Sequence, residues 1–200
     1  MEKNNSVLND LIIRYPQLRD CRKDIESAYT LLEKCYTAKG KVLICGNGGS
    51  ACDSDHFASN LVKGFTLPRK VEPELLEGKK LQYGLSAISL SSQTAAITAT
   101  ANDNGFEMIF AQQVMAYGIK GDVLVGFSTS GNSGNVVTAA ELAKKLGMHT
   151  IALTGTSGGK LKEMCDACIR VPEKEGYKVQ ELHEPVYHCL AIMLEQHFFG

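Results

Sequence analysis

The sequence has almost no net charge and no long apolar run, and each absence limits what the protein can be. Its 200 residues carry a formal net charge of −1, which gives no sign of a nucleic-acid or acidic-lipid partner. No apolar run reaches the roughly 20 residues that a membrane-spanning helix needs. The first residues also lack the apolar core of a signal peptide. We therefore expect a cytoplasmic protein whose partners are neither membranes nor nucleic acids.

The sequence also lacks a disulfide framework. Its seven cysteines are odd in number, and several, such as Cys45 and Cys189, lie in apolar segments. Cys165 and Cys168 form a single C-x-x-C pattern, with no second pattern to complete a zinc site. We expect reduced thiols in a hydrophobic core rather than a redox pair or half of a zinc site.

Strand-like and helix-like segments alternate along the chain. Apolar positions at helical spacing in residues 6–38 predict two helices that Pro16 separates. Strand-like runs follow at residues 41–45, 85–90, 122–127, 149–153 and 167–171. Helical patterns cover residues 50–64, 93–117, 131–147, 158–165 and 178–198. This alternation predicts one α/β domain in which helices cover both faces of a parallel sheet.

Residues 68–74 interrupt this alternation with charges and two prolines. Such a composition opposes burial and predicts an exposed loop. The nearby cations Lys63 and Arg69 are either simply solvated or close enough to a site to assist in binding an anion.

Two loops rich in glycine and serine each follow a strand-like run and precede a helical one. The first reads G-N-G-G-S at residues 46–50, and the second reads S-T-S-G-N-S at residues 128–133. Loops at helix N-termini offer free N–H groups and the positive end of the helix dipole, and in parallel sheets ligands bind at this edge. Two such loops predict a phosphorylated small molecule as ligand. A third loop, at residues 155–159, is either part of the same site or only a tight turn.

A nucleotide is not the ligand that these loops predict. The first loop formally satisfies the dinucleotide pattern G-x-G-x-x-A, but no acidic residue closes a strand about 20 residues later to hold a ribose. No Gly-Lys-Ser or Gly-Lys-Thr follows the glycines, which excludes a Walker loop.

Further motifs complete an ordered set over nearly the whole chain. They are C-G-N-G-G-S at 45–50, H-F-A at 56–58, A-N-D at 101–103, the 128–133 loop, L-T-G at 153–155, Q-E-L-H at 180–183, and His188. This set resembles the sugar isomerase (SIS) family, and within it the phosphoheptose isomerases, which interconvert sedoheptulose 7-phosphate and a manno-heptose 7-phosphate. The resemblance implies a three-layer sandwich with a five-stranded parallel sheet over residues 1–200. It also implies a homotetramer that packs through helices in residues 1–39 and has active sites at subunit interfaces.

The resemblance also implies roles for individual residues. The residues implied to contact the sugar phosphate are Asn47, Gly48, Ser50, Asp103, Ser128, Thr129, Ser130, Ser133 and Gln180. The family binds a divalent metal ion, often zinc, and three of its four ligands are present here as His56, Gln180 and His188. His188 is in addition a candidate acid or base for proton transfer.

The fourth family ligand, a glutamate that also serves as base, is replaced here by Asn60. A neutral amide cannot accept the proton that an aldose–ketose isomerisation moves. Gln180, Glu184 and His188 have i, i+4, i+8 spacing and so share one helix face. We therefore expect Glu184 to supply the missing carboxylate from the opposite wall of the site. The alternative reading of Asn60 is a non-catalytic protein of the same fold that binds sugar phosphates and acts through partners.

Overall fold

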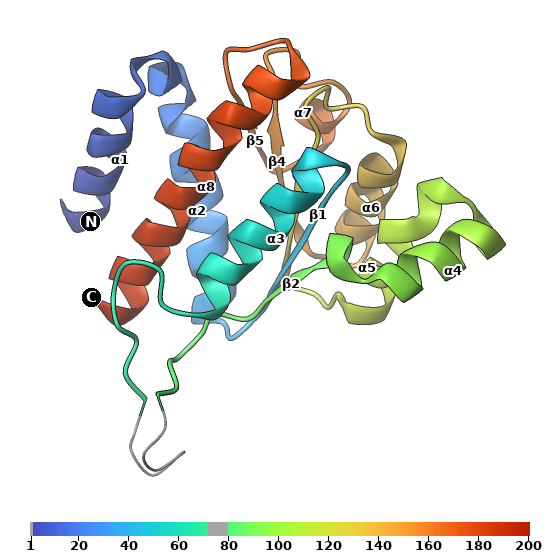
Figure 1. Ribbon diagram of the computed structural model, residues 1–200, viewed down its shortest axis with the longest axis horizontal. Coiled ribbons are helices and arrows are strands. Elements are labelled where there is room, and N and C mark those ends of the chain that lie inside the picture. The colour runs from blue at the N-terminus through green and yellow to red at the C-terminus, as the bar shows by residue number, and fades with distance from the viewer. Residues whose placement is uncertain (1, 72–79) are drawn as a thin grey trace.

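The structure, a computed structural model, describes residues 2–71 and 80–200. A parallel sheet lies between two layers of helices, as the alternation of segments predicts (Figure 1). The strands are β1 (Val42–Gly46), β2 (Ala87–Ser89), β3 (Val123–Phe127), β4 (His149–Thr154) and β5 (Ala167–Arg170). The helices are α1 (Glu2–Arg14), α2 (Arg22–Thr37), α3 (Gly49–Val62), α4 (Thr94–Asn104), α5 (Ile109–Tyr117), α6 (Gly134–Lys145), α7 (Leu161–Met164) and α8 (Gly176–Phe199).

The strand order is β2-β1-β3-β4-β5, and every neighbouring pair is parallel. The chain passes from β1 to β2 on one side and then returns to place β3 on the other side. Parallel sheets bind ligands at the carboxyl ends of the strands next to such a reversal. The 46–50 loop and the 128–133 loop follow β1 and β3, so the fold brings them to this point.

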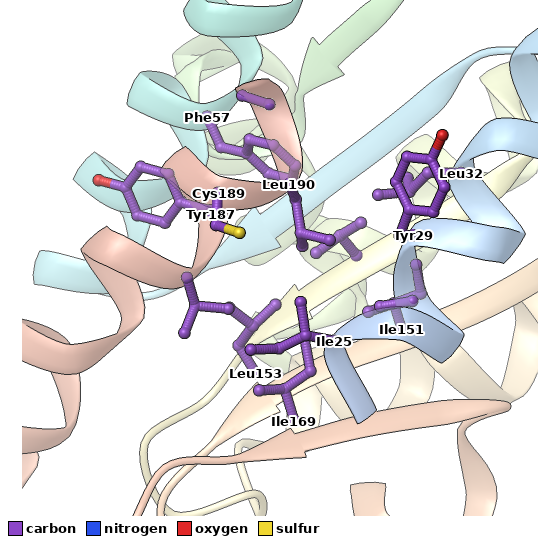
Figure 2. Packing of buried hydrophobic residues seen from close by; sticks show 14 of the residues in the cluster. Ile25, Tyr29, Leu32, Phe57, Ile151, Leu153, Ile169, Tyr187, Cys189 and Leu190 are labelled. Atoms are coloured by element: carbon purple, nitrogen blue, oxygen red, sulfur yellow. The ribbon is translucent and has the colours of Figure 1, made fainter. Parts of the chain in front are cut away.

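Alternate residues of each strand serve the two helical layers. In β1, Val42 and Ile44 join the core cluster with α1, α2, α3 and α8, while Leu43 and Cys45 join the cluster with α5 and α6. Figure 2 shows the first cluster, in which side chains of α2 and α8 pack on Ile151 and other strand residues. The two-residue period of a strand therefore fixes which helices stand over which face.

The N-terminal helices are separated at Pro16, as predicted. The proline begins a 3-10 turn, Pro16–Cys21, which joins α1 to α2. Its fixed φ and missing N–H suit the first turn of a helix and prevent α1 from continuing.

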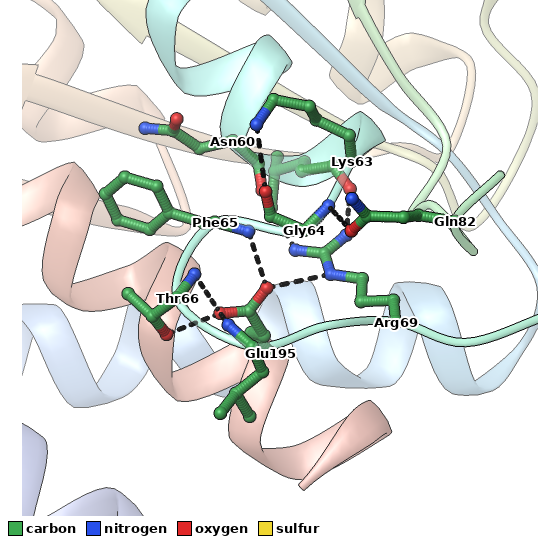
Figure 3. A network of polar contacts seen from close by, with 10 residues as sticks. Asn60, Lys63, Gly64, Phe65, Thr66, Arg69, Gln82 and Glu195 are labelled. Atoms are coloured by element: carbon green, nitrogen blue, oxygen red, sulfur yellow. Dashed lines mark hydrogen bonds and ion pairs between the residues drawn. The ribbon is translucent and has the colours of Figure 1, made fainter. Parts of the chain in front are cut away.

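The prediction that residues 68–74 form an exposed loop is wrong for Arg69, and residues 72–74 lie outside the described residues. Arg69 is 1% exposed and pairs with Glu195 of α8, whose side chain is 0% exposed, at 2.9 Å. Figure 3 shows that the Glu195 carboxylate also accepts the N–H groups of Phe65 and Thr66. Arg69 in turn donates to the carbonyls of Asn60 and Leu61 at the end of α3. A buried arginine with these partners is a structural link between α3 and α8.

Two further expectations concern free cysteine thiols and the absence of a membrane-spanning helix. All seven cysteines are free; Cys165 directly follows α7, and Cys168 lies within β5. Across residues 2–71 and 80–200, every helix is too short or too polar to cross a membrane.

Candidate active site

The 46–50 loop turns directly into α3 and lies under α8. Gly48 has a φ of +57°, a conformation that favours glycine. A side chain at Gly49 would overlap the carboxamide of Gln180, so the glycine allows α8 to approach the loop. Ser50 is buried in the first turn of α3, where its N–H donates to the Asn47 carbonyl at 3.0 Å. The Gln180 side chain therefore lies against Gly49, the residue between Gly48 and Ser50.

The 128–133 loop closes on itself before α6 begins. The hydroxyls of Ser128 and Ser133 lie 2.9 Å apart, and the Asn132 N–H donates to the Ser130 hydroxyl at 3.1 Å. The loop reaches α8, because Thr129 Oγ1 lies 3.7 Å from the Cβ position of Gly176. Its hydroxyls and the N-terminus of α6 are polar groups of the kind that bind phosphate.

The third loop, residues 155–159, supports the second. The Gly155 N–H donates to the Thr129 carbonyl at 3.0 Å, and the Leu161 N–H donates to the Gly131 carbonyl at 3.1 Å. These bonds hold the back of the 128–133 loop in place. The sequence left open whether the 155–159 loop is part of the ligand site or only a tight turn. The contacts described here are those of a turn that supports the 128–133 loop.

Gly131 is the position in this pair of loops with the least tolerance for a side chain. Its φ is +68°, and an added Cβ would overlap the Gly158 backbone. We expect Gly131→Ala to weaken the binding of inorganic phosphate by at least tenfold, because the loops must separate to admit the methyl group. Titration calorimetry with phosphate measures this, with Gly121→Ala as control: Gly121 also has positive φ, at +92°, but nothing lies within 4 Å of its added Cβ. Equal phosphate affinity in both variants would contradict the prediction.

Asn47 and Asn135 join the first loop to the second. Each carboxamide donates to the other, with N–O distances of 2.8 and 2.9 Å. Asn135 is 1% exposed and lies in the first turn of α6. The sequence analysis identified Asn47 but missed Asn135, because an asparagine inside a helix carries no local signal of such a pair.

A polar cavity of about 460 Å³ lies between α3 and α8. Its walls are Cys52, Asp53, His56, Tyr177, Gln180, Glu181, Glu184 and Tyr187. A smaller cavity of about 260 Å³ adjoins it and is lined by Glu181, Glu184 and His188 among others. Glu181 and Glu184 of α8 line both cavities, and the Glu184 side chain is 54% exposed.

His56, Glu184 and His188 form one group at this boundary. One nitrogen or oxygen from each lies within 4.8 Å of the others, and His56 Nδ1 is 3.8 Å from Glu184 Oε1. Burial, and second the neighbouring His56, lower the pKa of His188, whose Nε2 is buried without a hydrogen-bond partner. A neutral imidazole with an unpaired nitrogen suits a metal ligand or a proton acceptor. The structure thus places Glu184 beside both histidines, in the relation that the helix spacing predicts.

Two other positions of the family pattern, Asn60 and Asp103, are not members of this group. Asn60 is buried one turn after His56, and its side-chain nitrogen has no hydrogen-bond partner. Asp103 is exposed at the end of α4, where it accepts a hydrogen bond from Asn102. Figure 1 shows α4 at the right-hand edge and α8 left of the centre, with α3 between them, so the contact of Asp103 with a ligand stays a prediction.

Asp53 and Tyr187 are cavity residues that the sequence analysis did not select. Burial, and second the charge of Glu184, raise the pKa of Asp53 to about 6. The Tyr187 hydroxyl lies 3.0 Å from His56 Nδ1. The sequence places Asp53 three residues before His56 and Tyr187 seven residues after Gln180. Neither was selected, because an aspartate in a helix and a tyrosine in an apolar run are usually structural.

The fold, its strand order and the two polar loops are those of an α/β protein that binds its ligand at the carboxyl ends of the strands. Comparison with known proteins identifies the class, because residues 17–155 match the SIS domain family. The phosphoheptose isomerase of Helicobacter pylori strain P12 is 46% identical over 181 residues, which is 90% of this chain and 88% of that protein. The solved phosphoheptose isomerase of Neisseria gonorrhoeae is 35% identical, with a TM-score of 0.79 and 98% of both chains covered. That of Francisella tularensis is 36% identical, with a TM-score of 0.78 over 98% of this chain and 97% of that one. The chain belongs to the phosphoheptose isomerase family of SIS-domain proteins.

Proposed function

We propose that the protein is a phosphosugar aldose–ketose isomerase that interconverts sedoheptulose 7-phosphate and a manno-heptose 7-phosphate. The observation that carries this proposal is the position of Glu184 beside His56 and His188, at the boundary of two adjoining cavities. Membership of the family indicates the class of reaction. Within the group of His56, Glu184 and His188, Glu184 provides the carboxylate that Asn60 lacks.

The reaction removes a proton from the carbon next to a carbonyl and returns it to the neighbouring carbon. Glu184 is the group that takes and returns this proton, because a carboxylate can change its protonation state during turnover. His188, which burial holds neutral, either exchanges the second proton with the sugar oxygens or binds a metal ion, because its free nitrogen cannot do both at once. The enediolate that forms between the two transfers needs hydrogen-bond donors or a cation close to its oxygens.

The 128–133 loop fixes the other end of the substrate. It binds the phosphate through the hydroxyls of Ser128, Thr129, Ser130 and Ser133 and through the α6 N-terminus. From Gly176, which adjoins Thr129, the helix rises about 12 Å to Glu184 and about 18 Å to His188. A sugar held by its phosphate therefore passes Gln180, which contacts its hydroxyls, and reaches Glu184 before His188.

The residues present fit a divalent metal ion, and zinc is the ion we propose. Two imidazoles and a carboxylate within 4.8 Å of one another are the donor types that zinc prefers. The unpartnered Nε2 of His188 is a donor that the protein itself leaves unused. Gln180 adds a further oxygen on the same cavity wall. Such an ion supplies positive charge next to the developing enediolate.

We further propose that the chain forms a homotetramer through the helices in residues 1–39. Ile13 of α1 is 76% exposed, and a large apolar side chain at a helix surface is suited to burial against a second subunit. Active sites at subunit interfaces would also allow a neighbouring chain to complete the wall opposite α8.

Incubation with sedoheptulose 7-phosphate in heavy water tests the proposal. We expect solvent deuterium to enter the sugar at the carbon next to the carbonyl, because the abstracted proton exchanges with solvent on the enzyme. Mass spectrometry and proton NMR of the recovered sugar measure the incorporation. A sugar phosphate that raises the melting temperature but gains no deuterium would support the non-catalytic alternative instead. The carboxylate at Glu184 favours the isomerase, since a protein that only binds sugar phosphates needs no base beside its histidines.

A further inference from the structure

The smaller cavity of the candidate site is lined by a cation that the proposed reaction leaves without a role. Arg14, the last residue of α1, lines this cavity of about 260 Å³ together with Glu184 and His188. Among the described residues that line either of the two adjoining cavities, Arg14 is the one lysine or arginine. Apart from the histidines, the other ionised side chains of the two walls are carboxylates. Arg14 is therefore the side chain that attracts a negatively charged group of a ligand.

The fold brings Arg14 to this cavity from a helix that is far from α8 in the sequence. Pro16 disfavours a helical conformation of the residue before it, so α1 ends at Arg14. Helix α1 packs against α8, and its Leu8 and Leu11 are fully buried in the core cluster that also contains side chains of α8 (Figure 1). This packing fixes the end of α1 beside the part of α8 that lines the cavity.

The guanidinium of Arg14 is oriented by two neighbours and keeps donors for a ligand. Its Nε donates to Asp10 at 2.8 Å, and its central carbon lies 5.6 Å from the ring centroid of Tyr15. In the described part of the chain its two terminal nitrogens have no hydrogen-bond partner, and it forms no ion pair with Glu181 or Glu184 of the same cavity. The terminal nitrogens carry N–H groups in one plane, an arrangement that suits two oxygens of an anionic ligand.

The two cations that the sequence analysis considered as anion-binding groups do not serve this part of the site. Arg69 is 1% exposed and pairs with Glu195. Lys63 donates to the Gly64 carbonyl at 3.0 Å, and neither of these cations is among the residues that line the two cavities. Of these three cationic side chains, Arg14 is therefore the one in a position to meet a ligand there.

We propose that Arg14 is a catalytic residue that donates hydrogen bonds to the oxygens of the enediolate. A sugar whose phosphate is bound at the 128–133 loop reaches Glu184 with its carbonyl end, which is the end that reacts and which then lies at the cavity that Arg14 lines. Negative charge develops on the carbonyl oxygen as Glu184 removes the proton. The hydrogen bonds from Arg14 are therefore stronger in the transition state than with the neutral sugar. This inference rests on the proposed function and does not require a metal ion.

Binding of two sugar phosphates tests this contact without turnover. Gluconate 6-phosphate has a carboxylate at the end opposite its phosphate, with two coplanar anionic oxygens like those of an enediolate, whereas glucitol 6-phosphate has a neutral hydroxyl there. Titration calorimetry uses protein freed of metal by a chelator, at 0.15 M salt, where charges more than about 8 Å apart are largely screened.

We expect the unchanged protein to bind gluconate 6-phosphate more tightly than glucitol 6-phosphate. Arg14→Gln should weaken the binding of gluconate 6-phosphate by about tenfold, the lower end of what a hydrogen bond to a charged group provides, and should change that of glucitol 6-phosphate by less than about threefold. A gluconate 6-phosphate affinity no higher than that of glucitol 6-phosphate, or an equal loss for both ligands in Arg14→Gln, would overturn the proposal.

Turnover of sedoheptulose 7-phosphate provides a second readout. We expect Arg14→Gln to lower kcat by about 10–100-fold with little change in KM, a smaller loss than a donor in a closed site gives, because the Arg14 side chain is 53% exposed. Asp10→Asn is the matched control, since it breaks the same exposed ion pair but keeps the guanidinium, and it should change kcat by less than about twofold.

An unchanged kcat in Arg14→Gln, or an equal loss in Asp10→Asn, would contradict the role of Arg14 in catalysis. If the unchanged protein fails to isomerise the sugar, the proposed function fails. The comparison of the two ligands then still decides whether Arg14 binds an anionic group in the cavity.

Discussion

Glu184→Gln is expected to lower kcat by about 10²–10⁴-fold, the range that general acid–base catalysis contributes. The glutamine keeps the shape of the side chain and can still hydrogen-bond, but it cannot take up a proton. Since Asn60 also offers only an amide, no second carboxylate remains in the group with His56 and His188. Steady-state kinetics give kcat, and titration calorimetry with sedoheptulose 7-phosphate gives the dissociation constant, which should change little.

Glu181→Gln is the matched control for this experiment. Glu181 lies on the same helix and lines the same two cavities, but it is outside the group formed by the histidines. Both substitutions remove one negative charge from the cavity wall. A loss of turnover in Glu184→Gln alone shows that the position matters rather than the overall charge. Unchanged turnover in Glu184→Gln would reject the transfer of the family's base to α8.

Glu195→Gln is expected to lower the free energy of unfolding by about 3–5 kcal/mol. The substitution leaves the buried guanidinium of Arg69 without its counter-charge, and removing one partner of a buried pair is costly. Urea denaturation followed by circular dichroism measures the change. Glu33→Gln is the control, because Glu33 meets His197 at 3.8 Å near the surface and is worth about 0–1 kcal/mol.

The double variant Arg69→Met, Glu195→Leu should not recover this stability. Apolar replacement often rescues a buried ion pair, but the Glu195 carboxylate also accepts the backbone N–H groups of Phe65, Thr66 and Leu67. Those partly buried donors would lose their acceptor in the double variant. Full recovery would show that the charge pair alone accounts for the loss.

Acid should weaken this pair only at low pH. Burial raises the pKa of Glu195, but the hydrogen bonds from Thr66, the backbone and Arg69 outweigh it, so the pKa is lowered overall. A carboxyl whose pKa is lowered by folding stabilises the protein above the pKa of the unfolded chain. That contribution disappears as the pH falls through the lowered value in the folded protein.

The sequence is sufficient to predict the elements of this fold and the loops at its ligand edge. Buried parallel strands read as short apolar runs, which is why the run at 122–127 corresponds to β3 (Val123–Phe127) almost residue for residue. The run at 85–90 is longer than β2 (Ala87–Ser89), because pairing with β1 starts only at Ala87. The place of Glu184 on α8 follows from helix spacing alone.

Contacts between distant segments are what the sequence does not reveal. His56 and Tyr187 are 131 residues apart in the chain, and Arg69 and Glu195 are 126 residues apart. No local pattern marks such pairs, because burial of a polar side chain depends on which partner the fold brings to it. Arg69 in particular lies in a charged, proline-bearing segment that reads as solvated, and its burial depends on the Glu195 carboxylate of α8 and on the carbonyls of Asn60 and Leu61.

The reciprocal bonds of Asn47 and Asn135 have a consequence for how the two loops can diverge. An amide is the only side-chain group that offers a donor and an acceptor in this geometry, so an aspartate at either position would place two acceptors face to face. Replacement of one asparagine therefore leaves the carboxamide of the other without a matching hydrogen-bond partner. We therefore expect substitutions at positions 47 and 135 to occur together in related sequences, which would couple the evolution of the loops after β1 and β3.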